Sequence, residues 1–248
     1  RELIALLEFH CWGRPVPWCT VPDDSVIYRA KLIYGIKHSE QLVENQKDKA
    51  RIIAQGCLRI LKSGRIVLEK YFKSKGEYWA PTSSLAGLRL VTAVAAILGV
   101  PIYTIDLDSG YVQSNTPSGT YLVIPVYLVE LMGDDWMLAY AEAAARDPNG
   151  QVLFPLWKNL YGKSDSGTNF IVDFQNSLTA AAGFQVLPHC HGTMVRHVEE
   201  EPGRPSVMAN YVDDLAAALS GGGADVLWEL LAKRWRFAKP YPLVRFLG

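Results

Sequence analysis

Apolar residues recur along this chain with two different periods, which predicts a mixture of helices and strands. Leu85, Leu88 and Val91 recur at helical spacing after the polar residues Ser83-Ser84, and the pattern stops at Gly99. Serine before such a run and glycine after it are typical of a helix start and a helix end. Further helices are predicted over residues 130–146, 170–182 and 226–237.

Shorter apolar runs rich in β-branched residues predict strands. They cover residues 27–36, 64–71, 100–107, 151–157, 184–187, 193–198 and 241–246. Residues 1–28 are rich in Trp, Pro and Cys and have no clean period, so an irregular N-terminal extension is expected there. Strands and helices alternating in this way indicate an α+β or an α/β sheet domain.

Three aspartates lie where predicted strands end. Asp106 comes at the end of the run 100–107, and Asp213 and Asp214 separate two apolar runs, 207–212 and 215–219, which predicts a hairpin with two carboxylates at its tip. Carboxylates beside apolar strands are costly unless they meet cations. Mg²⁺ prefers such oxygen ligands, and two ions about 4 Å apart serve phosphoryl transfer. The alternative is a merely polar turn, which is common for Asp.

Charge is balanced overall but divided along the sequence. The 248 residues contain 25 Lys plus Arg and 25 Asp plus Glu. Residues 29–75 hold twelve basic and four acidic residues, whereas residues 79–156 hold two basic and seven acidic ones. This division suits a phosphate-binding element beside a metal centre, and it also suits a solvated basic face that binds nothing.

Five sequence blocks, in the same order, resemble the reverse transcriptase of copia-type retrotransposons. The blocks are KARIIAQG at residues 49–56, the segment 79–114 with its IDLDSGY, LYG at 160–162, YVDD at 211–214 and RFLG at 245–248. The resemblance implies an α+β fold with fingers and a palm, the palm being an antiparallel sheet packed on helices, with no thumb. Residues 29–79 would be a fingers-like basic segment, and residues 80–248 a palm-like region with a fingers insertion at about 115–160.

The resemblance also implies an activity, RNA-directed DNA synthesis, and a role for each matching residue. Asp106, Asp213 and Asp214 would be catalytic and, with the backbone of Leu107, would hold two Mg²⁺ ions or Mn²⁺ in their place. The nucleotide-binding residues would be Lys49 and Arg51 at the triphosphate and Tyr111 beneath the sugar, where a ring excludes a 2′-hydroxyl. The implied partners are an RNA or DNA template–primer and deoxynucleoside triphosphates.

Departures from the family pattern leave a second interpretation open. The Lys-Gln pair and the Arg that follow LYG in the family are replaced by Lys163-Ser164-Asp165-Ser166-Gly167-Thr168. Asp108 replaces a Lys, as an extra ligand or a repulsive neighbour, and Gln113-Ser114 replace Asn-Gly. The alternative function is therefore an inactive, retroelement-derived interaction module among the protein subunits of a larger complex.

Cysteine content and hydropathy bear on the compartment. Four cysteines in 248 residues do not make a disulfide scaffold, which favours an intracellular protein of the cytoplasm or nucleus. The most apolar stretch, 85–102, contains Arg89, Gly99 and Pro101, so we expect no transmembrane segment. The chain begins at Arg1 rather than Met, so an organelle remains an alternative location, since a targeting segment could precede this residue.

Overall fold

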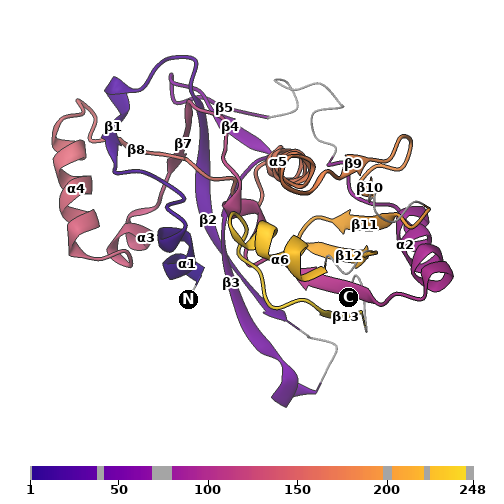
Figure 1. Ribbon diagram of the computed structural model, residues 1–248. Coiled ribbons are helices and arrows are strands. Elements are labelled where there is room, and N and C mark those ends of the chain that lie inside the picture. The colour runs from indigo at the N-terminus through magenta and orange to yellow at the C-terminus, as the bar shows by residue number, and fades with distance from the viewer. Residues whose placement is uncertain (1, 38–41, 69–79, 198–202, 221–223, 244–248) are drawn as a thin grey trace. The chain divides into compact units, whose positions relative to one another are not determined.

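The computed structural model describes residues 2–37, 42–68, 80–197, 203–220 and 224–243 (Figure 1). The chain forms two compact units, each built from two segments of the sequence. Unit 1 comprises residues 1–78 and 115–166, and unit 2 comprises residues 79–114 and 167–248. Both combine helices with sheets, so the fold is α+β.

Unit 1 is organised around a mixed sheet and a two-stranded ribbon. In the described residues its seven strands have the order β1–β8–β7–β2–β4–β5, with β3 paired to β2. These strands are β1 (Val16–Pro17), β2 (Val26–Lys37), β3 (Lys47–Ala54), β4 (Leu58–Ile60), β5 (Ile66–Leu68), β7 (Thr120–Val123) and β8 (Val152–Pro155). The start of β2 lies in the sheet, parallel to β7, whereas its remainder from Ala30 onwards pairs with β3 alone as the ribbon.

Short helices complete unit 1. They are α1 (Glu2–Glu8), η1 (Trp18–Thr20), η2 (Val43–Asn45), α3 (Val126–Glu130) and α4 (Asp134–Ala145). The prediction of an irregular segment over residues 1–28 is wrong in part, because α1 packs on β3 and buries Leu6. Seven residues span two turns, too few for a helical period to stand out in the sequence.

Asp147 joins two distant parts of unit 1. Its carboxylate accepts hydrogen bonds from the backbone N–H groups of Cys19, Asn149 and Gln151 at 2.8, 2.9 and 3.0 Å. The bond from Gln151 is the largest of the effects that lower the pKa of Asp147 below its usual value of 3.8. The ionised side chain therefore fastens η1 to the turn between α4 and β8.

Lowering the pH should reduce the stability of unit 1 because it protonates Asp147. Because its pKa is lower in the folded than in the unfolded protein, its stabilisation is complete above about pH 4 and is lost as the pH falls through the folded pKa. Asp147→Asn should reduce stability at pH 7 and flatten its decline with acid, as measured by urea unfolding from pH 7 to pH 3. Asp23→Asn, at an exposed aspartate of the same unit, is the control. Parallel pH profiles for wild type and Asp147→Asn would contradict this role.

Unit 2 is a three-layered structure with an antiparallel sheet in the middle. In the described residues the order of its six strands is β13–β6–β12–β11–β10–β9. They are β6 (Ile102–Asp106), β9 (Gln185–Val186), β10 (Thr193–Arg196), β11 (Ser206–Tyr211), β12 (Asp214–Ala218) and β13 (Tyr241–Pro242). The helices are α2 (Leu85–Leu98), η5 (Gly110–Gln113), α5 (Ser166–Ala182) and α6 (Ala224–Ala232).

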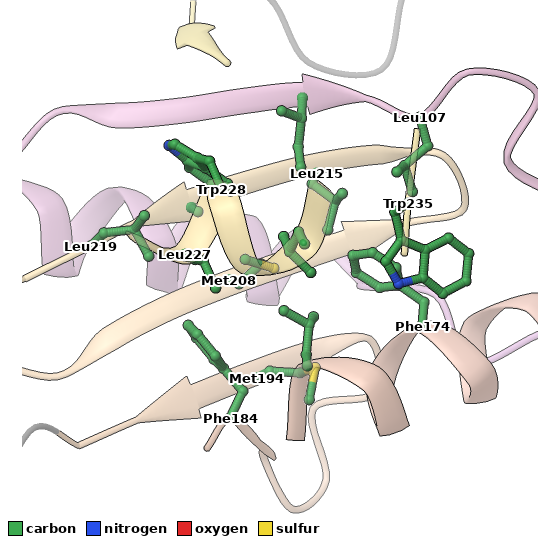
Figure 2. Packing of buried hydrophobic residues seen from close by; sticks show 14 of the residues in the cluster. Leu107, Phe174, Phe184, Met194, Met208, Leu215, Leu219, Leu227, Trp228 and Trp235 are labelled. Atoms are coloured by element: carbon green, nitrogen blue, oxygen red, sulfur yellow. The ribbon is translucent and has the colours of Figure 1, made fainter. Parts of the chain in front are cut away.

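Strand periodicity divides the apolar residues of unit 2 between two cores. On β12, Leu215 and Ala217 face α5 and α6, whereas Ala218 faces α2. Figure 2 shows the larger core, in which Met208 and Leu215 of the sheet pack with Trp228 and Trp235. Both faces of the strands that carry the aspartates are therefore covered by helices, which fixes the strand ends.

Parts of some predicted elements fall outside the described residues. The strand predicted over 64–71 is described only as β5, and the one over 241–246 only as β13. The RFLG block lies outside the described residues. A search of the described residues found no helix that is both long and apolar enough to span a membrane.

Candidate functional site

The hairpin of β11 and β12 places Asp213 in its turn and Asp214 in a strand. Its turn is Val212-Asp213, one residue earlier than predicted, and Asp214 is the first residue of β12. Val212 has φ +57°, which is unusual for a β-branched residue, although tight hairpin turns require positive φ. Strain of this kind is kept where surrounding structure enforces it and is common at functional sites.

A buried amide side chain fixes that turn. Asn210 is fully buried, and its Nδ2 donates to the carbonyl oxygen of Val212 at 2.9 Å. Its backbone N–H donates to Gly192, and its carbonyl oxygen accepts from the N–H of Ser83, both at 2.7 Å. The sequence contained a signal for this residue that we did not use, a polar side chain within an otherwise apolar strand next to two aspartates.

Strand β6 brings Asp106 beside the hairpin. Asp106 lies directly opposite Asp214, and the N–H of Leu107 donates to the carbonyl oxygen of Asp213 at 3.1 Å. A pair in this register has its Cα atoms roughly 4.5 Å apart. The three aspartates that the sequence singled out thus lie together at neighbouring strand ends.

A glycine leaves room for Asp213. A methyl group added at Gly110 would lie 3.1 Å from Cβ of Asp213 and 3.4 Å from the ring of Phe170. Gly110 follows Ser109, whose φ of +54° turns the chain from β6 into η5. Any side chain at Gly110 would therefore displace Asp213 or the core behind it.

The donor set at these strand ends fits a hard divalent cation. Asp106 is exposed, and Asp213 and Asp214 are half-buried. Like charges directly opposite on neighbouring strands repel, and a cation between them relieves the repulsion. In the described part of the chain no group of three or more His, Cys, Asp and Glu side chains is arranged to hold a metal. Mg²⁺, however, is commonly held by one or two carboxylates together with substrate phosphates.

Leu107 and Tyr111 contribute mainly to packing in this structure. The side chain of Leu107 is buried in the larger core of unit 2, so only its backbone is left to bind a ligand. Tyr111, in η5, is half-buried, and its ring meets that of Phe170 edge-on at a centroid distance of 5.8 Å. Its role at a nucleotide sugar stays a prediction.

Lys49 and Arg51 belong to the ribbon of unit 1. They share one face of β3 with Lys47, and the antiparallel pairing of β2 with β3 places Lys31 of β2 on the same face. Asp48 points to the other face. The Arg51 guanidinium lies over the ring of Tyr161, 5.0 Å from its centroid. Among the side chains that the structure describes, the ribbon therefore presents four cations on one face.

A hollow opens beside these bases. It has a volume of about 210 Å³, and Gly35, opposite Lys49, contributes no side chain to it. Its lining residues are Ile33, Tyr34, Gly35, Ile36, Lys49 and Arg51. A hollow of this size, with two cations at its wall, is suited to part of an anionic ligand.

Two of the sequence blocks meet in unit 1. The N–H of Ala54 donates to the carbonyl oxygen of Tyr161 at 2.8 Å, and that of Gly56 donates to Gly162 at 3.1 Å. A methyl group at Gly56 would lie 2.0 Å from the Gly162 carbonyl oxygen, and one at Gly162 would lie 2.3 Å from that of Ala54. The glycines of KARIIAQG and LYG therefore permit the two segments to cross.

The departures from the family pattern have partners of their own. Lys163, which follows LYG, has a buried side chain that pairs with Asp165. Gln113 makes three hydrogen bonds with the backbone around Asp108 and Arg236. The sequence marked both positions as substitutions but did not indicate what they contact.

No family model and no curated protein matches this chain.

Proposed function

We propose that this chain is the fingers and palm of an RNA-directed DNA polymerase of the copia type. The single observation that carries the proposal is the pairing of Asp106 with Asp214 beside the strained turn that presents Asp213. Unit 2 would be the palm, and the ribbon of unit 1 would belong to the fingers. The matching order of the five sequence blocks supports this assignment.

The proposed reaction adds one deoxynucleotide to a primer. The oxygen of the primer 3′-hydroxyl forms a bond to the α-phosphorus of a deoxynucleoside triphosphate, the bond to the pyrophosphate oxygen breaks, and the hydroxyl proton leaves to water. Asp106 and Asp213 would hold Mg²⁺, with Asp214 and the Leu107 carbonyl oxygen as further ligands. Bound in pairs, such ions lower the pKa of the attacking hydroxyl and stabilise the leaving pyrophosphate.

The chain's other residues would bind and select the nucleotide. Lys49 and Arg51 would contact the triphosphate, whose charge builds up during transfer. The cationic face of the ribbon supports this role, because phosphates are the ligands that such a face attracts. Tyr111 would lie beneath the sugar.

The alternative is an interaction module without synthesis. The ion pair of Lys163 with Asp165 favours it, because this pair occupies the position where the family has residues that seat the template. Such a module would keep the fold and bind protein subunits of a larger complex.

Primer extension on a short RNA–DNA hybrid distinguishes the two functions. With Mg²⁺, the wild type should extend the primer and Asp213→Asn should not. Mn²⁺ should replace Mg²⁺, and EDTA should stop the reaction. No extension by a folded wild type, with either metal, would overturn the polymerase proposal in favour of the interaction module.

Tyr111 tests the proposed selection of deoxynucleotides. Tyr111→Val should raise the incorporation of ribonucleotides relative to deoxynucleotides at least about tenfold, since removal of the ring leaves room for a 2′-hydroxyl. The measurement is the ratio of kcat/KM for the two nucleotides, with Mg²⁺ dependence unchanged. An unchanged ratio together with lower thermal stability would mean that Tyr111 only packs against Phe170.

A further inference from the structure

Gln113 lies at the end of η5, and both the nitrogen and the oxygen of its side-chain amide form hydrogen bonds. Its Nε2 donates to the carbonyl oxygens of Asp108 and Arg236, each at 2.7 Å. Its Oε1 accepts from the backbone N–H of Arg236 at 2.6 Å. All three bonds lie within unit 2.

The segment that Gln113 reaches forms the outer border of β6. Asp108 N–H donates to the Arg236 carbonyl oxygen at 3.0 Å, and Ala238 N–H donates to that of Asp106 at 3.4 Å. Leu107 lies opposite Phe237 between these bonds. The backbone of Asp106 is therefore bordered by β12 on one side and by residues 236–238 on the other.

A glutamine amide suits this place in a way that few side chains do. The carbonyl oxygen of Asp108 and the N–H of Arg236 each need a partner, and the Arg236 carbonyl oxygen can accept a second hydrogen bond beside the one from Asp108. A primary amide offers two donors and one acceptor in a single planar group. Met has the same length without them, and Glu keeps only the acceptor at neutral pH.

We infer that Gln113 is a positioning residue for Asp106. By joining η5 to residue 236, its amide holds the chain on both sides of Asp108, and so fixes the direction in which the Asp106 carboxylate leaves the sheet. The inference rests on the proposed function. A misplacement of about 1 Å at a reacting centre can reduce a rate by about a hundredfold, so a loosened strand end should act on turnover more than on binding.

The test uses Gln113→Met in primer extension with Mg²⁺, next to Gln185→Met as a control at an exposed glutamine of β9. Gln113→Met should lower kcat at least about tenfold with a change of less than about threefold in the KM of the nucleotide. Gln185→Met should match the wild type. If Gln113→Met does not fold, Gln113→Glu takes its place, since it keeps the shape and loses both donors.

Hydrogen exchange supplies a readout that does not depend on activity. The N–H groups of Asp108 and Arg236 should exchange faster in Gln113→Met than in the wild type, while those of β10 and β11 stay unchanged. Unchanged exchange with unchanged kcat, or a fall in kcat that merely follows the unfolded fraction, would overturn the inference. If the wild type extends no primer, the proposed function is wrong. Hydrogen exchange then decides by itself whether Gln113 holds Asp108 in place.

Discussion

Asp213→Asn should lower the rate of primer extension about 10³-fold, because a metal ligand contributes several kcal/mol of charge stabilisation in the transition state. The amide keeps the shape of the carboxylate but not its charge, and Asp213 is only half-buried at a turn. The free energy of unfolding should therefore change by less than about 0.5 kcal/mol. Single-turnover extension and urea unfolding of the same preparations separate the two effects.

Asp108→Asn is the matched control for this experiment. Asp108 is exposed, lies two residues after Asp106 and carries the same charge as Asp213. If it is only a neighbouring charge, the variant should extend primers at the wild-type rate or somewhat faster. A loss as large as that of Asp213→Asn would make Asp108 a ligand. Full activity in Asp213→Asn would remove the proposed metal site altogether.

Gly162→Ala should destabilise unit 1 by about 3 kcal/mol or more. The added methyl group meets the carbonyl oxygen of Ala54 at 2.3 Å, and the φ of +82° is unfavourable for any residue with a β-carbon. Overpacking costs about 1 to 3 kcal/mol and left-handed backbone strain about 1 to 2 kcal/mol. Urea unfolding, monitored with a spectroscopic probe in unit 1, measures the sum of the two costs.

Gly64→Ala separates the two costs. Gly64 has nearly the same φ, +81°, but an added methyl group meets nothing within 4 Å. This variant should lose only about 1 to 2 kcal/mol, the backbone part. Equal losses in the two variants would mean that the crossing of Gly162 over Ala54 is not tight in solution.

Local signals in the sequence predicted the elements that carry them. Helix α2 begins after Ser84, whose Oγ accepts a hydrogen bond from the N–H of Gly87, and it ends at Gly99 with φ +66°. Both ends were predicted from those two residues. The hairpin of β11 and β12 was likewise predicted, although the turn is one residue earlier, because positive φ at Val212 has no sequence signature.

Contacts between distant segments could not be predicted in the same way. The pattern around Gln113 says only that a polar residue follows the strand, whereas its partner, Arg236, lies 123 residues further along. The same holds where the two blocks cross, because a side chain at Gly56 would meet the carbonyl oxygen of Gly162, and one at Gly162 would meet that of Ala54. For the site, the sequence supplied the three aspartates, and the structure added the residues that hold them.

The two strands that neighbour β6 determine when the aspartates come together, and when the edge of β6 is closed, during synthesis of the chain. Strand β6 is made early, but its two neighbours are β12 and the last described segment, so it has no partner until more than a hundred further residues are made. Unit 1, in contrast, ends at residue 166. A nascent chain can thus complete unit 1 while β6 is still an open edge, and such edges invite pairing with other chains. Residues 236–243 close this edge after β12 has paired, so an interruption of translation just before them leaves an aggregation-prone intermediate.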